Sequence, residues 1–357
     1  MLIFIISFLL ASLISPLIIY WYRANRWLDD PEQRHAKKTH SVAVPRGGGL
    51  VVASTVLVVS ALFLHWDSYL VAIMVGMMLL TITGFLDDVF DIHPILRLAI
   101  GTLAALIVVG SGIGIAYISN PFTEGVIHLN QPQIAVDFLG ETRTIWILAD
   151  LFAVFFIVWN MNIVNWSKGV DGQMPGFVSI ALIFVGLLSS KFLDDPTQFN
   201  TAYLAFGAAG AYAGLLVWNW YPQKIMPGYG GGSLAGYLLA ILAILSGAKV
   251  ATALMVLGVP TADALFTIAR RLKAGKSPFW GDRGHMHHKL LDVFHWSKQQ
   301  VALFYWICSL VLGVLSLYLN TVQKLFTIVA VVLVVSFVLI YAKYQTIRRS
   351  QSKHQRT

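Results

Sequence analysis

The sequence predicts an all-α protein that crosses a membrane many times. Of its 357 residues, 57% are hydrophobic and 12% are charged, whereas about a quarter of the residues of a soluble domain are charged. Apolar stretches of about 20 residues, the length that spans a hydrocarbon core ~30 Å thick, recur along the chain. We expect about eleven transmembrane helices, at roughly 2–22, 48–66, 68–86, 95–118, 144–164, 174–190, 201–218, 232–247, 249–269, 299–319 and 324–342.

The positive charges between these helices predict the orientation. Alternate loops, together with a basic tail at 343–357, hold 21 of the 25 Lys and Arg residues. The positive-inside rule places these segments in the cytoplasm, so we expect the N-terminus outside and the C-terminus inside. Residues 1–357 then form a single integral-membrane domain. Its expected cytoplasmic loops are 23–47, 87–97, 165–173, 219–233 and 270–298.

The longest loop on the other side, 119–143, contains two segments of β-prone residues. Segments 126–129 and 134–138 flank the turn-forming residues 130–133, which predicts a small external β-hairpin. This loop has no cluster of reactive side chains, and the single Cys308 lies in an apolar stretch, which excludes a disulfide framework and a cysteine-rich metal site. The function is therefore expected in the cytoplasmic loops.

Three acidic residues follow the end of one apolar stretch. An acid at the centre of a membrane helix costs roughly 2.5–3.5 kcal/mol, so Asp87, Asp88 and Asp91 are expected where the helix meets water or lines a polar site. If the helix continues, Asp87 and Asp91 share one face and repel each other unless a cation, a bound proton or a basic partner is close. The alternative is a solvated, acidic helix end.

Polar residues in two further loops are suited to bind an anion or a metal ion. The first loop carries Lys38 and His40 before the glycines at 47–49, whose N–H groups can approach an anion; the alternative is a basic loop attracted to anionic lipid. In the third loop, Asn162 and Asn165 lie one helical turn apart and offer amide groups to a ligand or a metal. Asn is also a common cap at helix ends.

The fourth and fifth loops contain patterns typical of phosphate sites. Lys224 precedes a glycine-rich stretch and Ser233, which together could cradle a phosphate at a helix start; the alternative is a flexible turn with Ser233 as the N-cap. The fifth loop is suited to bind a metal through neutral imidazoles or a polyphosphate through donated hydrogen bonds, and its excess of Lys and Arg favours phosphate. Its candidate ligands are Arg283, His285, His287 and His288.

Several of these motifs, in this order, resemble one family of membrane enzymes. The chain is similar to the polyprenyl-phosphate N-acetylhexosamine-1-phosphate transferases, the MraY/WecA-like enzymes of glycosyltransferase family 4, over nearly its whole length. Its His motif is similar to the branch that makes lipid-linked GlcNAc for envelope polysaccharides. The matching motifs are Pro-Arg-x-Gly-Gly within 40–49, Gly-Phe-Leu-Asp-Asp-x-x-Asp at 84–91, Asn-x-x-Asn-x-x-x-Gly-x-Asp-Gly at 162–172, Asn-x-x-Pro-x-Lys-Ile at 219–225 and Gly-His-Met-His-His-x-Leu-Leu at 284–291.

The resemblance implies a reaction, its partners and a location. We expect transfer of GlcNAc-1-phosphate from a UDP-N-acetylhexosamine to undecaprenyl phosphate, with release of UMP and with Mg²⁺ as cofactor. The reaction would begin the synthesis of a lipid-linked envelope glycan at the plasma membrane, a step of cell wall biogenesis and polysaccharide biosynthesis. No nucleic-acid partner is expected, and the sequence leaves open whether the chain forms a homodimer.

The resemblance also implies roles for individual residues. Asp87 and Asp88 would orient or deprotonate the lipid phosphate and help to hold Mg²⁺, and Asn165 and Asp171 would lie beside the metal. The fifth loop would grip the diphosphate of the nucleotide sugar. The remaining candidates for substrate binding are Lys38 and His40, at the lipid phosphate, and Asp91, Asn162, Lys224 and Ser233.

Two departures from the family pattern change the expected charge of the site. The family usually has Asp where Lys168 stands. It usually has Met-Gly-Asp where this chain has Met226-Pro227-Gly228-Tyr229-Gly230-Gly231-Gly232, which is one residue longer. Two lost carboxylates and one gained ammonium shift the local charge by three units, which disfavours a tightly held Mg²⁺. Lys168 could replace the metal as a fixed cation and is counted as a catalytic candidate. The alternative is an altered or inactive relative that binds UDP-sugar or lipid phosphate without normal turnover.

A secondary transporter is the rival class. Transporters place acids near the middle of their spans, and only Asp150 and Asp263 come near such a position. Asp263 lies seven residues before Arg270 on the same predicted helix face, so we interpret that pair as structural support.

Overall fold

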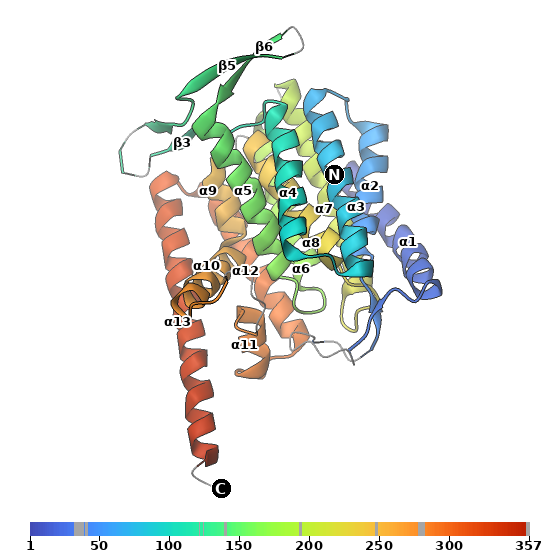
Figure 1. Ribbon diagram of the computed structural model, residues 1–357, viewed down its shortest axis with the longest axis vertical. Helices are drawn as coiled ribbons and strands as arrows, with labels where there is room; N and C mark the ends of the chain where they lie inside the picture. The colour runs from blue at the N-terminus through green and yellow to red at the C-terminus, as the bar shows by residue number, and fades with distance from the viewer. Residues whose placement is uncertain are drawn as a thin grey trace.

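The computed structural model describes residues 1–31, 39, 42–120, 122–123, 125–138, 141–192, 195–246, 249–277 and 283–354. These residues form a bundle of helices with β-strands gathered mainly at one end (Figure 1). The helices are α1 (Leu2–Ala24), α2 (Gly48–Phe63), α3 (Ser68–Phe90), α4 (Pro94–Gly110), α5 (Ile147–Trp166), α6 (Gln173–Ser189), α7 (Pro196–Asn219), α8 (Gly228–Leu245), α9 (Lys249–Val256), α10 (Gly258–Lys273), α11 (Met286–Asp292), α12 (Lys298–Tyr318) and α13 (Thr321–His354), with a short 3₁₀ helix at Ser190–Phe192.

Helix α8 is the centre of the bundle. It packs against α2, α3 and α5, and also against α6, α7 and α9, and nearly all of its residues are buried. Small residues allow these neighbours to approach closely. A Cβ on Gly236 would overlap the backbone of Asn160 and Met161 in α5, so only glycine fits at that crossing.

The eleven predicted spans all contain helix, but they differ in length. Seven helices of the described chain are long and apolar enough to cross a membrane: α1, α3, α5, α7, α8, α12 and α13. The apolar helices α2, α4 and α6 have 16, 17 and 17 residues, which at 1.5 Å per residue is shorter than a ~30 Å core. The structure therefore supports a polytopic all-α membrane protein, in which seven or eight helical segments of the described chain, rather than the eleven expected, are long and apolar enough to span.

The window predicted at 249–269 is not one straight span. It contains α9 and α10, which meet at Leu257 with an angle of 87° between them. Pro260 lies in the first turn of α10, where a proline is tolerated because its missing N–H would have no helical partner. Helix α10 ends in Arg270, Arg271 and Lys273. This end of α10 is therefore polar, unlike the end of a buried span.

The predicted external hairpin was wrong in its pairing. Both strands form, but β4 (Val126–His128) pairs with β3 (Tyr117–Ser119), and β5 (Gln133–Phe138) pairs with β6 (Glu141–Trp146). The cis peptide bond before Pro132 lies in the segment between β4 and β5. Each strand thus joins the segment on its other side, and two antiparallel pairs replace the single expected one.

The segments that carry the candidate site residues meet at the other end of the bundle. Figure 1 shows β5 and β6 at the top, whereas the α3–α4 connection, α11 and the C-terminal part of α13 lie at the bottom. A short ladder of β1 (Leu28–Asp29) and β2 (Val44–Pro45) holds the first loop there. The gathering of the loops at one end fits the alternation on which the prediction of orientation was based.

Candidate active site

Residues 166–172, at the end of α5 and in the loop before α6, contact several other segments of the site. Trp166 lies beside the histidine loop, defined here as residues 283–291, and Lys168 reaches the start of α8. The Gly169 carbonyl accepts a hydrogen bond from the Thr39 hydroxyl at 2.8 Å. The Gly172 N–H donates to Asn219 Oδ1 at 3.0 Å. This connecting loop therefore organises the site.

Asp87 is buried and paired with Arg97. The Nη1 of Arg97, from the first turn of α4, donates to both carboxylate oxygens, at 2.8 and 3.0 Å. The same guanidinium lies over the ring of Tyr229, 5.1 Å from its centroid. Asp91, however, does not continue the helix: it is exposed and takes a left-handed conformation (φ 51°) as the C-cap of α3. The helix therefore does not continue through Asp91, which was the condition for Asp87 and Asp91 to share a helical face.

Asp88 meets the first residues of α8. Its Oδ1 accepts a hydrogen bond from the Tyr229 N–H at 2.8 Å, and a Cβ on Gly228 would overlap its carboxylate. Gly228 also has a φ of +69°, so a residue with a side chain would be strained there. The Nζ of Lys168 donates to the Gly228 carbonyl at 2.5 Å. A carboxylate, an ammonium group and a helix start thus converge on one glycine.

Burial perturbs the Lys168 ammonium. Desolvation lowers the pKa of Lys168 to about 8, against the opposing attraction of Asp88 and Asp87. The group lies beside Asp88 and Asp87, and their attraction favours its charged form.

The glycines after Gly228 pack helices instead of forming a phosphate loop. Residues 228–232 lie within the first turns of α8. A Cβ on Gly84 or on Gly49 would overlap Gly230, so the backbones of α2, α3 and α8 are in contact there. Ser233 is buried inside the helix and is not its N-cap. The interpretation as a flexible turn with Ser233 as the N-cap was therefore wrong, and phosphate binding by Lys224 and Ser233 stays a prediction.

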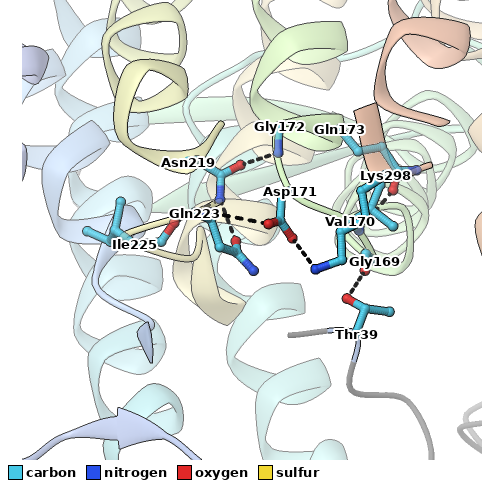
Figure 2. A network of polar contacts seen from close by, with 10 residues as sticks. All are labelled: Thr39, Gly169, Val170, Asp171, Gly172, Gln173, Asn219, Gln223, Ile225 and Lys298. Atoms are coloured by element: carbon cyan, nitrogen blue, oxygen red, sulfur yellow. Dashed lines mark hydrogen bonds and ion pairs between the residues drawn. The ribbon is translucent and has the colours of Figure 1, made fainter. Parts of the chain in front are cut away.

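Asp171 belongs to a second polar network, drawn in Figure 2. Its Oδ1 pairs with Lys298 Nζ at 3.2 Å, and its Oδ2 accepts the Gln223 N–H at 3.2 Å. Asn219 holds the same turn, because its amide donates to Gln223 Oε1 and to the Ile225 carbonyl, both at 2.8 Å. Asp171 is buried. It joins the start of α12 to the α7–α8 turn, and no described contact joins it to Asp87 or Asp88.

His285 is fixed by partners on both ring nitrogens. Its Nδ1 donates to Asp263 Oδ2 at 3.0 Å, and its Nε2 lies 3.3 Å from Nη2 of Arg271. Asp263 Oδ1 also accepts the Met286 N–H at 2.9 Å. These partners assign the proton to Nδ1, so that Nε2 can accept from Arg271. These contacts of Asp263 run to the histidine loop, where it supports His285 and Met286.

His287 and His288 are buried and neutral. Desolvation lowers the pKa of His287 well below its usual value and that of His288 to about 4, with nearby cations acting in the same direction. The Nδ1 atoms of both rings have no hydrogen-bond partner among the described residues. A Cβ on Gly169 would overlap the ring of His287. The pair offers donors or acceptors to a ligand, without the positive charge of an imidazolium.

The other candidates are placed as follows. Asn162 donates to the carbonyl of Val158 within its own helix, whereas Asn165 has a buried Oδ1 without a partner in the described chain. Lys224 is exposed over the Trp218 ring, 5.1 Å away. Arg283 pairs with the exposed Asp292, at 2.8 and 3.1 Å. The predictions for Lys38 and His40 lie outside the described residues.

The donors present do not fit a Mg²⁺ ion. Mg²⁺ requires an octahedral shell of oxygens, usually with one or two free carboxylates. Asp87 and Asp171 are each paired with a cation, and Asp88 is engaged at the start of α8. Within the described ranges, no three His, Cys, Asp or Glu side chains are grouped to hold a metal. Asn165 contributes a single unpartnered oxygen, far short of an octahedral shell.

Sequence reasoning missed four partners of the predicted residues. Arg97 had a signal, because it is the sole cation of the acidic loop 87–97. No sequence pattern indicated the other three partners, because each comes from a different segment of the chain. They are Tyr229, Arg271 and Lys298, which lie 141, 14 and 127 residues from Asp88, His285 and Asp171.

Comparison with known proteins places these motifs in context. Residues 70–247 match the family model described as glycosyl transferase family 4. Over 95% of this chain and 90% of the relative, the sequence is 25% identical to a Bacillus subtilis (strain 168) protein named "Probable undecaprenyl-phosphate N-acetylglucosaminyl 1-phosphate transferase". It is 26% identical, over 88% of this chain and 96% of the relative, to a phospho-N-acetylmuramoyl-pentapeptide-transferase of Thermoanaerobacter sp. (strain X514). A decaprenyl-phosphate N-acetylglucosaminephosphotransferase of Mycolicibacterium smegmatis is 28% identical, over 78% of this chain and 73% of the relative.

Proposed function

Since the chain belongs to the polyprenyl-phosphate hexosamine-1-phosphate transferases of glycosyl transferase family 4, we propose that it transfers GlcNAc-1-phosphate from UDP-GlcNAc to undecaprenyl phosphate. The relatives from Bacillus and Mycolicibacterium are named for N-acetylglucosamine, and the one from Thermoanaerobacter is named for a muramoyl pentapeptide. The spacing of His285, His287 and His288 favours the first kind, because the muramoyl branch usually has three consecutive histidines. The reaction begins envelope glycan synthesis at the plasma membrane.

The proposed reaction exchanges one phosphoanhydride bond for another. An oxygen of the lipid phosphate attacks the sugar-bearing phosphorus of the UDP-sugar, and a new P–O–P bond forms. The bond from that phosphorus to the bridging oxygen breaks, and UMP leaves with the electron pair. Two anions must meet, so the protein has to supply positive charge and hold both phosphates in line.

The observation that carries the proposal is the convergence at Gly228. Asp88, Lys168 and the start of α8 meet there. Asp88 would orient the lipid phosphate and accept its proton, if the phosphate arrives singly protonated. Lys168 would stabilise the charge that develops on the transferred group, as a fixed donor can in a water-poor site. The neutral His287 and His288 would donate hydrogen bonds to the nucleotide sugar from their place across the 166–172 loop.

A transfer assay tests the proposal. Purified protein in lipid nanodiscs is given undecaprenyl phosphate and, in parallel, radiolabelled UDP-GlcNAc, UDP-GalNAc and UDP-MurNAc-pentapeptide. We expect label in the lipid fraction and one UMP per lipid product with UDP-GlcNAc. The Asp88→Asn variant is the matched negative control. If label reaches the lipid fraction only from another UDP-sugar, that sugar replaces GlcNAc in the proposal. If no donor labels the lipid fraction, the proposed transfer is contradicted.

A binding protein without turnover is the second candidate. It is favoured by the ion pairs of Asp87 and Asp171, which would have to open before either carboxylate could act on a substrate. Tight binding of UDP-GlcNAc together with absent transfer in the same nanodiscs would select this alternative.

A further inference from the structure

We infer that this active site carries its own cations in place of a divalent metal ion, and that Lys168 is the cation that meets the substrate diphosphate. The inference rests on the proposed function, because it names the group that neutralises that diphosphate. It follows from a disagreement between the family, in which Mg²⁺ is expected, and the side chains of this chain.

Three of the carboxylates that remain are already paired with a cation. Arg97 pairs with Asp87 through both carboxylate oxygens, and Lys298 pairs with Asp171. Asp29, the acid of the first loop, pairs with Arg46 at 2.9 Å. A metal ion would have to displace a resident cation at each of these acids. Cations attached to the chain are present at high effective concentration, so displacement is unfavourable.

Lys168 is placed where a ligand anion can reach it. One of its three N–H groups donates to the Gly228 carbonyl, and an ammonium has two further donors. Gly228 is the first residue of α8, whose N-terminal dipole also favours an anion. The side chain is anchored at this point beside Asp88, the residue proposed to act on the lipid phosphate. An anion bound there would satisfy the two remaining donors.

The surrounding segments supply the rest of the positive charge. The expected cytoplasmic loops and the basic tail contain 21 Lys and Arg against nine Asp and Glu. Seven of the cations belong to the loop 270–298, which reaches the site through His285 and Lys298. Two substrates with phosphate groups therefore enter a region with excess positive charge even without a metal ion.

The alternative is that Lys168 only fastens the start of α8. In that case its removal would loosen the fold in every buffer, and it would have no specific effect on binding of a diphosphate. Replacing Lys168 with the acid usual in the family separates these readings. If Lys168 only fastens α8, the Lys168→Asp variant should not bind a metal ion. If Lys168 occupies the place of the metal, the same variant should bind one.

The test measures binding of UDP to purified protein by calorimetry, in EDTA and in excess Mg²⁺. We expect equal affinity of the unaltered protein in both buffers, and an affinity lower by about 10- to 100-fold in Lys168→Ala, the range for a charge-assisted hydrogen bond. Lys168→Asp should bind UDP only with Mg²⁺. It should also give a protein-bound Mn²⁺ signal in electron paramagnetic resonance that the unaltered protein lacks. Lys191→Ala, which removes an exposed cation outside the expected cytoplasmic loops, should bind like the unaltered protein.

Three results overturn the inference: loss of UDP binding in EDTA with Lys168→Ala tolerated, a Mn²⁺ site in the unaltered protein, or no UDP binding in either buffer. Turnover in the transfer assay is scored separately. If UDP binds without a metal ion but no transfer occurs, the inference about Lys168 stands and the proposed function is refuted. If transfer requires Mg²⁺ and Lys168→Ala is still active, the proposed function stands and the inference is refuted.

Discussion

The Asp87–Arg97 pair allows a quantitative prediction about stability. The Asp87 side chain is 4% exposed and that of Arg97 is 24% exposed. Arg97→Met keeps most of the side-chain volume but leaves the carboxylate buried without its cation. Breaking a buried pair typically costs 3–5 kcal/mol, and partial exposure of the arginine screens some of it, so we expect a loss of about 2–3 kcal/mol. This reduces the ratio of folded to unfolded protein by roughly 30- to 150-fold.

A double-mutant cycle identifies the origin of this loss. Asp87→Asn alone should cost only about 1 kcal/mol, because Arg97 is closer to solvent. The combination Asp87→Asn with Arg97→Met should recover much of the stability lost in Arg97→Met, since no uncompensated charge remains. Unfolding by SDS in mixed micelles, followed by tryptophan fluorescence, measures all three variants. Arg348→Met, at an exposed position of α13, is the matched control.

The transfer assay on the same variants separates stability from chemistry. The double variant should be folded and still carries Asp88, the carboxylate proposed to act at the lipid phosphate, so a loss of transfer in it would report on the Asp87–Arg97 pair rather than on unfolding. The reasoning is refuted if Arg97→Met is as stable as the unaltered protein, or if Asp87→Asn does not relieve its defect.

Four further outcomes are expected. Asp88→Asn should abolish transfer while UDP affinity, set mainly by the histidine loop, changes by less than about threefold; unchanged transfer would show that the acid is only part of a helix end. Gly169→Ala should lower UDP affinity at least tenfold, because the added methyl group would overlap the ring of His287. The control Gly110→Ala should leave UDP affinity unchanged, because a Cβ at that position meets no other atom. UDP affinity should fall as the pH rises through about 8, because Lys168 loses its proton there; the fall should be absent in Lys168→Arg, and a flat profile in the unaltered protein would contradict it. Lys276→Cys should react with a membrane-impermeant maleimide only in opened cells, because its loop is expected in the cytoplasm. Labelling in sealed cells would contradict the predicted orientation.

The sequence predicted the helices well because burial in a membrane leaves a strong pattern. Every predicted window contains helix, since long apolar runs have few other ways to satisfy their backbone groups. The break at Leu257 was missed because the window 249–269 contains only two charged residues, Lys249 and Asp263, and is long enough to be read as one span. The hairpin failed for a different reason: strand pairing depends on neighbours outside the two strands, and β3 and β6 were not recognised.

The candidate site was predicted in its parts but not in its connections. That the loops meet at one end followed from the alternation of the spans. That Asp87 is tied to Arg97, and Asp171 to Lys298, depends on tertiary contacts for which a single sequence gives little signal. The glycines at 228–232 were misread because a close helix crossing and a phosphate loop both require residues without a Cβ.

The way in which residues 166–172 are held has a consequence for how the site opens. The segment is fastened at Lys168, Gly169, Asp171 and Gly172 to four different parts of the chain. Losing one attachment leaves buried polar groups unsatisfied at the next, so the attachments should fail together. In native-state hydrogen exchange, the protected amides of this segment and of the α7–α8 turn should open as one cooperative unit. Replacing residues 166–172 alone with the segment of a relative would therefore disrupt this cooperative unit. Replacing the segment together with the residues that it contacts would preserve it.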